Sequence, residues 1–165
     1  GEKLYNYPHP RFNPGVPEGA PWGEVVIEKT RKNCLDGYSV RHSETGTGWG
    51  PLLYDIAMEW SSQQGGGLTS DRGDVSKDAY RVWDYYLRNR PDVEAAQLDI
   101  NNRGYSKVTP KDDSDDCDQV SSISWARQSN SNPEWGWSAE PTAYLYRVSG
   151  TPTTDALRKA GKLEE

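Results

Sequence analysis

The chain has 165 residues, enough for one domain around a single hydrophobic core. Its hydrophobic share is 33% and its formal net charge is −6. This acidic balance argues against a broad nucleic-acid surface, which needs clustered Lys and Arg. The sequence also lacks an apolar run of the ~18–20 residues that a membrane-spanning helix needs, so we expect no membrane span.

The cysteines and histidines indicate neither a disulfide scaffold nor a metal site. Cys34 and Cys117 are too few for a scaffold, so we expect two reduced thiols, with a single disulfide as the alternative. Together with His9 and His42 they show no zinc-ligand spacing. The two histidines lie in unrelated segments, and nothing in their placement indicates an acid–base couple.

The N-terminal third predicts an extended segment followed by a hairpin. Residues 1–23 hold five prolines and little periodicity, which predicts an extended arm ahead of a single domain over 24–165. Residues 24–31 and 34–43 are rich in side chains typical of strands, and a turn-prone Lys-Asn pair separates them. They therefore favour an antiparallel hairpin.

A helix is expected over 51–63. Pro51 suits the first helical turn, where a missing N–H costs nothing, and three glycines at 65–67 are typical of the residues beyond a helix end. Apolar side chains recur at helical spacing between these limits. They are Leu52, Leu53, Ile56, Ala57 and Trp60.

The next segments predict a short strand over 67–72 and a second helix. Ser76 is a natural N-cap for that helix, and Pro91 ends it. One face of the helix is apolar or aromatic. It consists of Ala79, Val82, Trp83, Tyr86 and Leu87.

The last third predicts strands over 93–99 and 142–150, separated by a long polar and acidic loop over 100–137. A short C-terminal helix should end near Gly161. Strands and helices mixed in this order predict an α+β fold, with a mixed, mostly antiparallel sheet flanked by helices.

The turn before the first predicted helix is rich in glycine. It consists of Thr45, Gly46, Thr47, Gly48, Trp49 and Gly50. A glycine turn at a helix start exposes backbone N–H groups and adds the positive end of the helix dipole, which suits a phosphate. It lacks the Lys-Ser or Lys-Thr of a P-loop. A turn kept only for its backbone geometry is the alternative.

This turn resembles the acyl-CoA loop of the GNAT acyltransferase superfamily, in which a strand runs into an Arg/Gln-x-x-Gly-x-Gly/Ala turn and a helix. The order that follows, a short strand and then a helix containing AYRVWDYY, is similar to the family's as well. The resemblance covers about residues 24–99, with 142–150 as a final strand. It implies a reduced GNAT-like fold and binding of acetyl-CoA by the glycine turn.

The sequence departs from the family at the positions that carry its chemistry. Thr45 stands where the family has Arg or Gln, and Trp83 aligns with the tyrosine that protonates the departing thiolate. Tyr80, Tyr85 and Tyr86 are the candidates to replace that tyrosine, and core or surface packing is the alternative for each.

The acceptor side of the family's site is also reduced. The family's first strand and first two helices have no counterpart in the 23-residue arm. Glu28, Asp36 and Glu44 are candidates for a general base by position only.

Three further segments, GWGPLLYD, VWDYYLRNRPDV and PTTDALRKAGKL, resemble proteins carried by tailed bacteriophages. Some large tailed phages have a prohead protease that cuts after Leu-x-Glu, often before Gly. The ends of the chain, Gly1 and Leu163-Glu164-Glu165, fit such processing. A trimmed chain or a tag-derived glycine is the alternative.

Two other features favour a structural interpretation. The run DDSDDCD over 112–118 could attract Ca²⁺ but lacks the EF-hand spacing, so a solvated acidic loop is expected. Trp135 and Trp137 would share one side of an extended segment, which favours a cover over the core rather than an exposed recognition patch.

The hypothesis that best fits these features is a phage-encoded, non-catalytic GNAT-like protein, structural or internal to the phage head, with other virion proteins as partners. The alternative is an active acetyl-CoA-dependent N-acyltransferase of the host cytoplasm. Its turn from Thr45 to Gly50 would hold the pyrophosphate, and one of the three tyrosines would act as the acid. A third hypothesis, an inhibitor of a host factor, is left open by the sequence.

Overall fold

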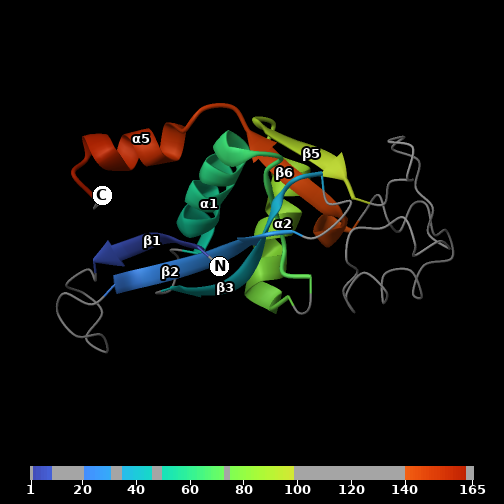
Figure 1. The fold of residues 1–165 in the computed structure, drawn as a ribbon, viewed down its shortest axis with the longest axis horizontal. Coiled ribbons are helices and arrows are strands. Elements are labelled where there is room, and N and C mark those ends of the chain that lie inside the picture. The colour runs from blue at the N-terminus through green and yellow to red at the C-terminus, as the bar shows by residue number, and fades with distance from the viewer. Residues whose placement is uncertain are drawn as a thin grey trace, which may run out of the picture.

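The computed structural model describes residues 2–8, 21–30, 35–45, 50–72, 75–98 and 140–162. They form a six-stranded mixed sheet in the order β1-β2-β3-β4-β6-β5, with helices packed against it (Figure 1). The predicted α+β class is confirmed.

The elements follow the predicted order closely. The strands are β1 Glu2–Pro8, β2 Pro21–Lys29, β3 Tyr38–Thr45, β4 Leu68–Thr69, β5 Val93–Gln97 and β6 Tyr144–Val148. The helices are α1 Gly50–Gln64, α2 Lys77–Asn89 and α5 Pro152–Lys159, and a short 3₁₀ turn, η2, covers Pro141–Ala143.

The predicted hairpin is confirmed as β2 and β3, which pair antiparallel from Gly23↔Thr45 to Lys29↔Tyr38. The register shifts between Val26 and Ile27, where β3 contributes an extra residue. Strand β1 pairs antiparallel with the other side of β2. The first residues of the predicted arm are therefore extended, as expected, and they also belong to the sheet.

The parallel pairing of the sheet lies between β3 and β4. The chain leaves β3, crosses through α1 and returns as β4, and such a crossover makes the two strands run in the same direction. The paired residues are Tyr38↔Leu68 and Ser39↔Thr69. Strand β4 is thus shorter than the predicted 67–72, and Ser70 to Arg72 leave the sheet.

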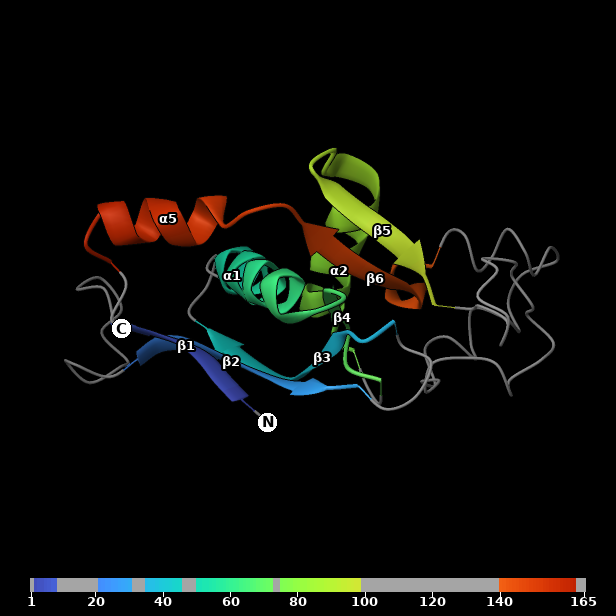
Figure 2. The ribbon, with the colours of Figure 1, turned by 45° about the horizontal axis from the view of Figure 1, so that its top comes forward.

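Helix α1 is confirmed and is more deeply enclosed than its pattern predicts. Of the predicted apolar face, Leu53, Ile56 and Ala57 are buried, whereas Leu52 and Trp60 are partly buried. The helix also buries Tyr54, Met58, Glu59 and Ser61. The reason is tertiary: α1 packs on β2 and β6 and is also contacted by α2 and α5. Figure 2 shows α1 across the sheet with α5 beside it.

Helix α2 begins as predicted. The Ser76 side-chain oxygen accepts a hydrogen bond from the Ala79 backbone N–H at 3.2 Å, which caps the helix. Val82, Trp83 and Tyr86 of α2 are buried in one cluster with residues of α1 and the sheet. Both helices therefore share one face of the sheet.

A small second cluster lies on the opposite face. It contains Leu98 and Leu145, with Leu35 packed against them. Because side chains alternate along a strand, Leu145 points away from the face that holds its neighbour Tyr146.

The C-terminal helix is also confirmed. Gly161 has φ +66°, and the Lys162 N–H donates to the Leu157 carbonyl oxygen at 2.9 Å. This is the left-handed glycine termination expected from the sequence.

Several predictions fall outside the described residues: the loop over 100–137 with its acidic cluster, the tryptophans at 135 and 137, both cysteines and His9. His42 lies exposed on β3, with its Nε2 3.8 Å from a Glu44 carboxylate oxygen. None of the described helices is both long and apolar enough to span a membrane.

The glycines that follow α1 allow a close approach of three strands. Gly67 has φ +123°, and a Cβ built there would lie closer than 3.0 Å to the Tyr146 carbonyl oxygen. A Cβ on Gly66 would meet the Leu35 carbonyl oxygen in the same way. These positions are where β3, β4 and β6 meet, so glycine is needed there for space as well as for φ.

We expect Gly67→Ala to lower the free energy of unfolding by about 2–4 kcal/mol, because it adds a backbone clash to an unfavourable φ. Gly150→Ala is the matched control, since Gly150 has φ +72° but no atom within 4 Å of an added Cβ. It should cost only about 1–2 kcal/mol. Urea unfolding measures both variants, and equal losses would contradict the role of the close approach.

Candidate functional site

Strands β3 and β4 diverge immediately after their short pairing. Strand β3 continues from Ser39 to Thr45, whereas β4 ends at Thr69. Among the described residues, no strand pairs with β3 on the β4 side beyond Ser39. An unpaired strand edge offers backbone N–H and C=O groups to an extended ligand. This divergence is the candidate site.

The predicted phosphate turn joins the end of β3 to the start of α1. Thr45 is the last residue of β3 and Gly50 the first of α1. Gly46, Thr47, Gly48 and Trp49 lie outside the described residues. The first turn of α1 carries no acidic side chain that would repel an anion. Binding of CoA by this turn stays a prediction.

A hydrogen bond joins β3 to α1 at the divergence. The hydroxyls of Ser43 and Tyr54 are 2.9 Å apart, and Tyr54 is buried. Burial raises the pKa of the Tyr54 phenol. The hydrogen bond to Ser43 lowers this pKa in part, and the nearby charge of Asp71 raises it further. Tyr54 is therefore neutral at ordinary pH. The sequence pattern missed it because its position lies off the predicted apolar face.

Trp83 lies at the centre of the buried aromatic side chains. It is 1% exposed, stacks on Tyr146 with ring centroids 5.6 Å apart and an interplanar angle of 21°, and meets Tyr54 edge-on at 5.2 Å. Tyr86 packs edge-on against it at 5.9 Å. Trp83 is thus a core residue that links α2 to α1 and β6.

The hydroxyl of Tyr86 hydrogen-bonds the ion pair formed by Asp55 and Arg90. It donates to Asp55 Oδ1 at 2.6 Å, and Arg90 Nη1 donates to the same oxygen at 3.0 Å. Burial raises the pKa of Tyr86 well above its ordinary value, and the negative Asp55 raises it further. Arg90 also bonds Asp92, which lowers the pKa of that carboxyl. This network ties the end of α2 to α1.

Tyr80 faces a buried carboxylate. Its hydroxyl lies 3.4 Å from Glu140 Oε2, while Glu140 Oε1 accepts from the Thr142 hydroxyl at 2.7 Å. Burial raises the pKa of Tyr80 to about 12, and the charge of Glu140 adds to this effect. Glu140 is the cap of η2. Tyr80 is a weaker acid here than in water, which makes proton donation harder.

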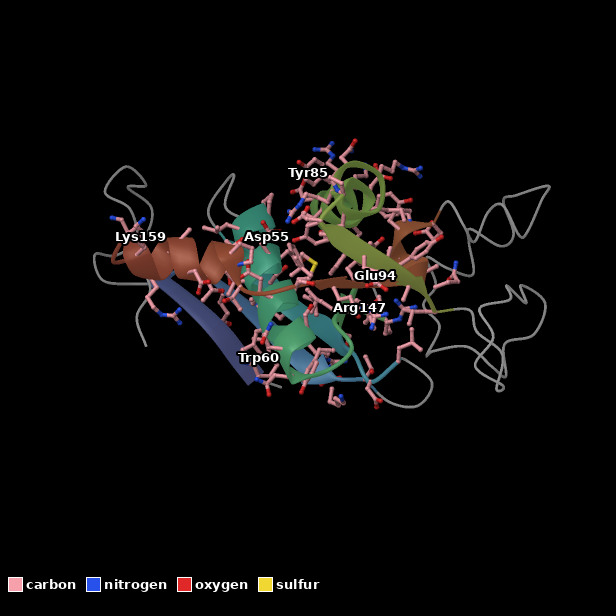
Figure 3. The ribbon with its side chains drawn as sticks, turned by 90° about the horizontal axis from the view of Figure 1, so that it is seen from above. Asp55, Trp60, Tyr85, Glu94, Arg147 and Lys159 are labelled. Atoms are coloured by element: carbon pink, nitrogen blue, oxygen red, sulfur yellow. The ribbon has the colours of Figure 1, made fainter. Side chains whose placement is uncertain are left out.

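Tyr85 lies elsewhere. It is 50% exposed and lies on the outer side of α2 (Figure 3). Asp55, the partner of the Tyr86 hydroxyl, lies on the other helix, α1. The three candidate tyrosines therefore do not converge: one is in the core, one faces Glu140 and one faces outward.

The candidate bases are also dispersed. Glu28 pairs with Arg41 on the exposed part of the hairpin at 3.5 Å, and Glu44 lies near His42. Asp36 sits in the turn before β3, with φ 57°, and its carbonyl oxygen accepts from Lys29. Over the ranges described, no three His, Cys, Asp or Glu side chains are grouped to hold a metal ion.

Comparison with known proteins yielded no match among family models, curated proteins or solved structures. The case for any function therefore rests on the sequence and the geometry above.

The pH dependence of stability in alkali includes a contribution from Tyr80, which a Tyr80 variant isolates. Its pKa is raised to about 12 from an ordinary 10.0, so the folded state keeps a proton that the unfolded state loses between these values. This stabilisation is present below pH 10 and is lost as pH rises through 12. Tyr80→Phe should make the fall in urea midpoint between pH 10 and 12 shallower. Tyr85→Phe, at an exposed site, serves as control, and an identical fall in both variants would contradict the assignment.

Proposed function

We propose that the chain is a non-catalytic protein built on a reduced GNAT-like fold, acting as a structural or interaction component of a phage virion. The fold part is supported by the order strand, helix, short strand, helix, which carries the resemblance and is formed by β3, α1, β4 and α2. The virion part is supported by the phage-like segments of the sequence alone.

The observation that carries the non-catalytic assignment is the packing of Trp83. An indole cannot supply the acidic hydroxyl that the family uses at this position, and its ring is enclosed by Tyr54, Tyr86 and Tyr146. A general acid must be within hydrogen-bond reach of the group it protonates and have a pKa near the working pH. The Tyr86 hydroxyl fails the first condition because it is engaged with Asp55, and Tyr80 fails the second.

A second candidate function is the binding of acyl-CoA, with or without transfer. It is favoured by one feature: the edge of β3 beyond Ser39 lies unpaired, within the described residues, and runs toward the start of α1. A strand edge can bond the amides of an extended arm, and a helix start can bond a phosphate. The two candidates differ in whether the ligand binds and in whether a thiol is released.

One experiment separates the candidates: titration calorimetry with acetyl-CoA, followed by a thiol-release assay with a panel of primary amines. We expect no thiol release above the uncatalysed rate. Gly48→Glu should abolish any heat of binding, because it places a carboxylate in the predicted phosphate turn. Gln63→Glu adds the same charge on the exposed last turn of α1 and should leave binding unchanged.

Thiol release that is lost in Gly48→Glu and kept in Gln63→Glu would overturn the non-catalytic assignment in favour of an acyltransferase. Binding without release would support a ligand-binding role on the same fold. The absence of both, with the protein folded, supports the structural assignment.

A further inference from the structure

The N-terminal end of α5 is completed by a side chain from another helix. The carboxylate of Glu59, on α1, accepts from the Thr153 N–H at 2.6 Å, the Thr154 N–H at 2.9 Å and the Thr154 hydroxyl at 2.6 Å. Glu59 is 1% exposed, which is unusual for a carboxylate unless donors surround it. The ordinary local cap is missing, since Thr151 makes no side-chain cap bond.

The backbone positions at the start of α5 can be accounted for one by one. Pro152 has no N–H, and the next two N–H groups bond Glu59. The Asp155 N–H bonds the Thr151 carbonyl oxygen at 2.8 Å. Glu59 therefore supplies the acceptors for the two donors that α5 cannot satisfy from its own chain.

Within the described residues, the buried part of the contact between α5 and the core is small. None of its residues is buried, and Leu157 is its apolar side chain packed against the main cluster. Its connection to β6 passes through Gly150, which has φ +72° and no atom within 4 Å of an added Cβ. Its C-terminal end is closed within the segment itself, by Lys162 and Leu157. At Gly150, therefore, no neighbouring atom packs against the position of a side chain.

We infer that Glu59 and the first turn of α5 form a latch, and that α5 detaches as a separate cooperative unit while the sheet, α1 and α2 stay folded. A helix of eight residues is marginal alone, so its order depends on tertiary contacts. Segments with little burial open far more often than the core. Hydrogen bonds to a charged acceptor are the strongest of the α5 contacts. The bonds to Glu59 therefore determine how large a fraction of the molecules has α5 detached.

The latch is independent of acyl-CoA binding and of the virion assignment. It concerns α5 alone, whose last turn carries the basic residues Arg158 and Lys159 (Figure 3 labels Lys159).

Hydrogen–deuterium exchange tests the latch in the full chain. Glu59→Gln keeps the side-chain shape but replaces one acceptor oxygen by an NH₂ group, which cannot accept from the helix. Amides of 153–161 should then exchange at least about tenfold faster, while α1 and α2 amides keep their wild-type rates. Glu94→Gln is the matched control: it removes an exposed carboxylate, paired with Arg147 on the sheet, and should change neither rate.

Thr154→Val tests the same contact should Glu59→Gln fail to fold, because it removes only the hydroxyl donor and keeps the side-chain volume. It should accelerate exchange in 153–161 about threefold or more. Exchange of α5 equal to that of Glu94→Gln would overturn the latch. Acceleration of α1, α2 and α5 by a common factor would overturn it as well, since α5 would then open only with the core.

Discussion

The stacking of Trp83 on Tyr146 is the contact on which the rest of the structure depends. It joins α2 to β6, and the edge-on contact with Tyr54 joins both to α1. A buried Trp of this kind contributes about 3–5 kcal/mol relative to Ala. Because α1 and α2 lie on one face of the sheet, a single aromatic cluster holds both helices in place.

The same contact bears on the proposed absence of catalysis. Position 83 holds a buried tryptophan that packs in the core, and an indole offers no ionisable hydroxyl. The hydroxyls around it are used to join elements: Tyr86 bonds Asp55, Tyr54 bonds Ser43, and Tyr146 bonds the Pro141 carbonyl oxygen. Burial also raises the pKa of each of these phenols. The aromatic groups therefore stabilise the fold, and we propose that the protein works through its surface.

Local chemistry made much of the fold predictable, and tertiary contacts explain what was missed. Helix α2 was predicted because Ser76 caps it and its apolar spacing is regular, and the end of α5 was predicted from Gly161. The burial of Glu59 could not be predicted, because its partners lie on a helix 94 and 95 residues further along the chain. The dispersion of the candidate tyrosines could not be predicted for the same reason. Helical spacing predicts the side of the helix on which a residue lies, but it does not predict which element packs against that side.

The acetyl-transfer rate of Trp83→Tyr tests whether position 83 belongs to the core or faces a bound acyl donor. This change introduces the hydroxyl that the proposed GNAT-like resemblance would place at this position. If position 83 belongs to the core, the new hydroxyl lies among Tyr54, Tyr86 and Tyr146, and the rate with acetyl-CoA stays at the uncatalysed level. A rate above that of the wild-type protein would show that position 83 faces a bound acyl donor, and the non-catalytic assignment would be wrong.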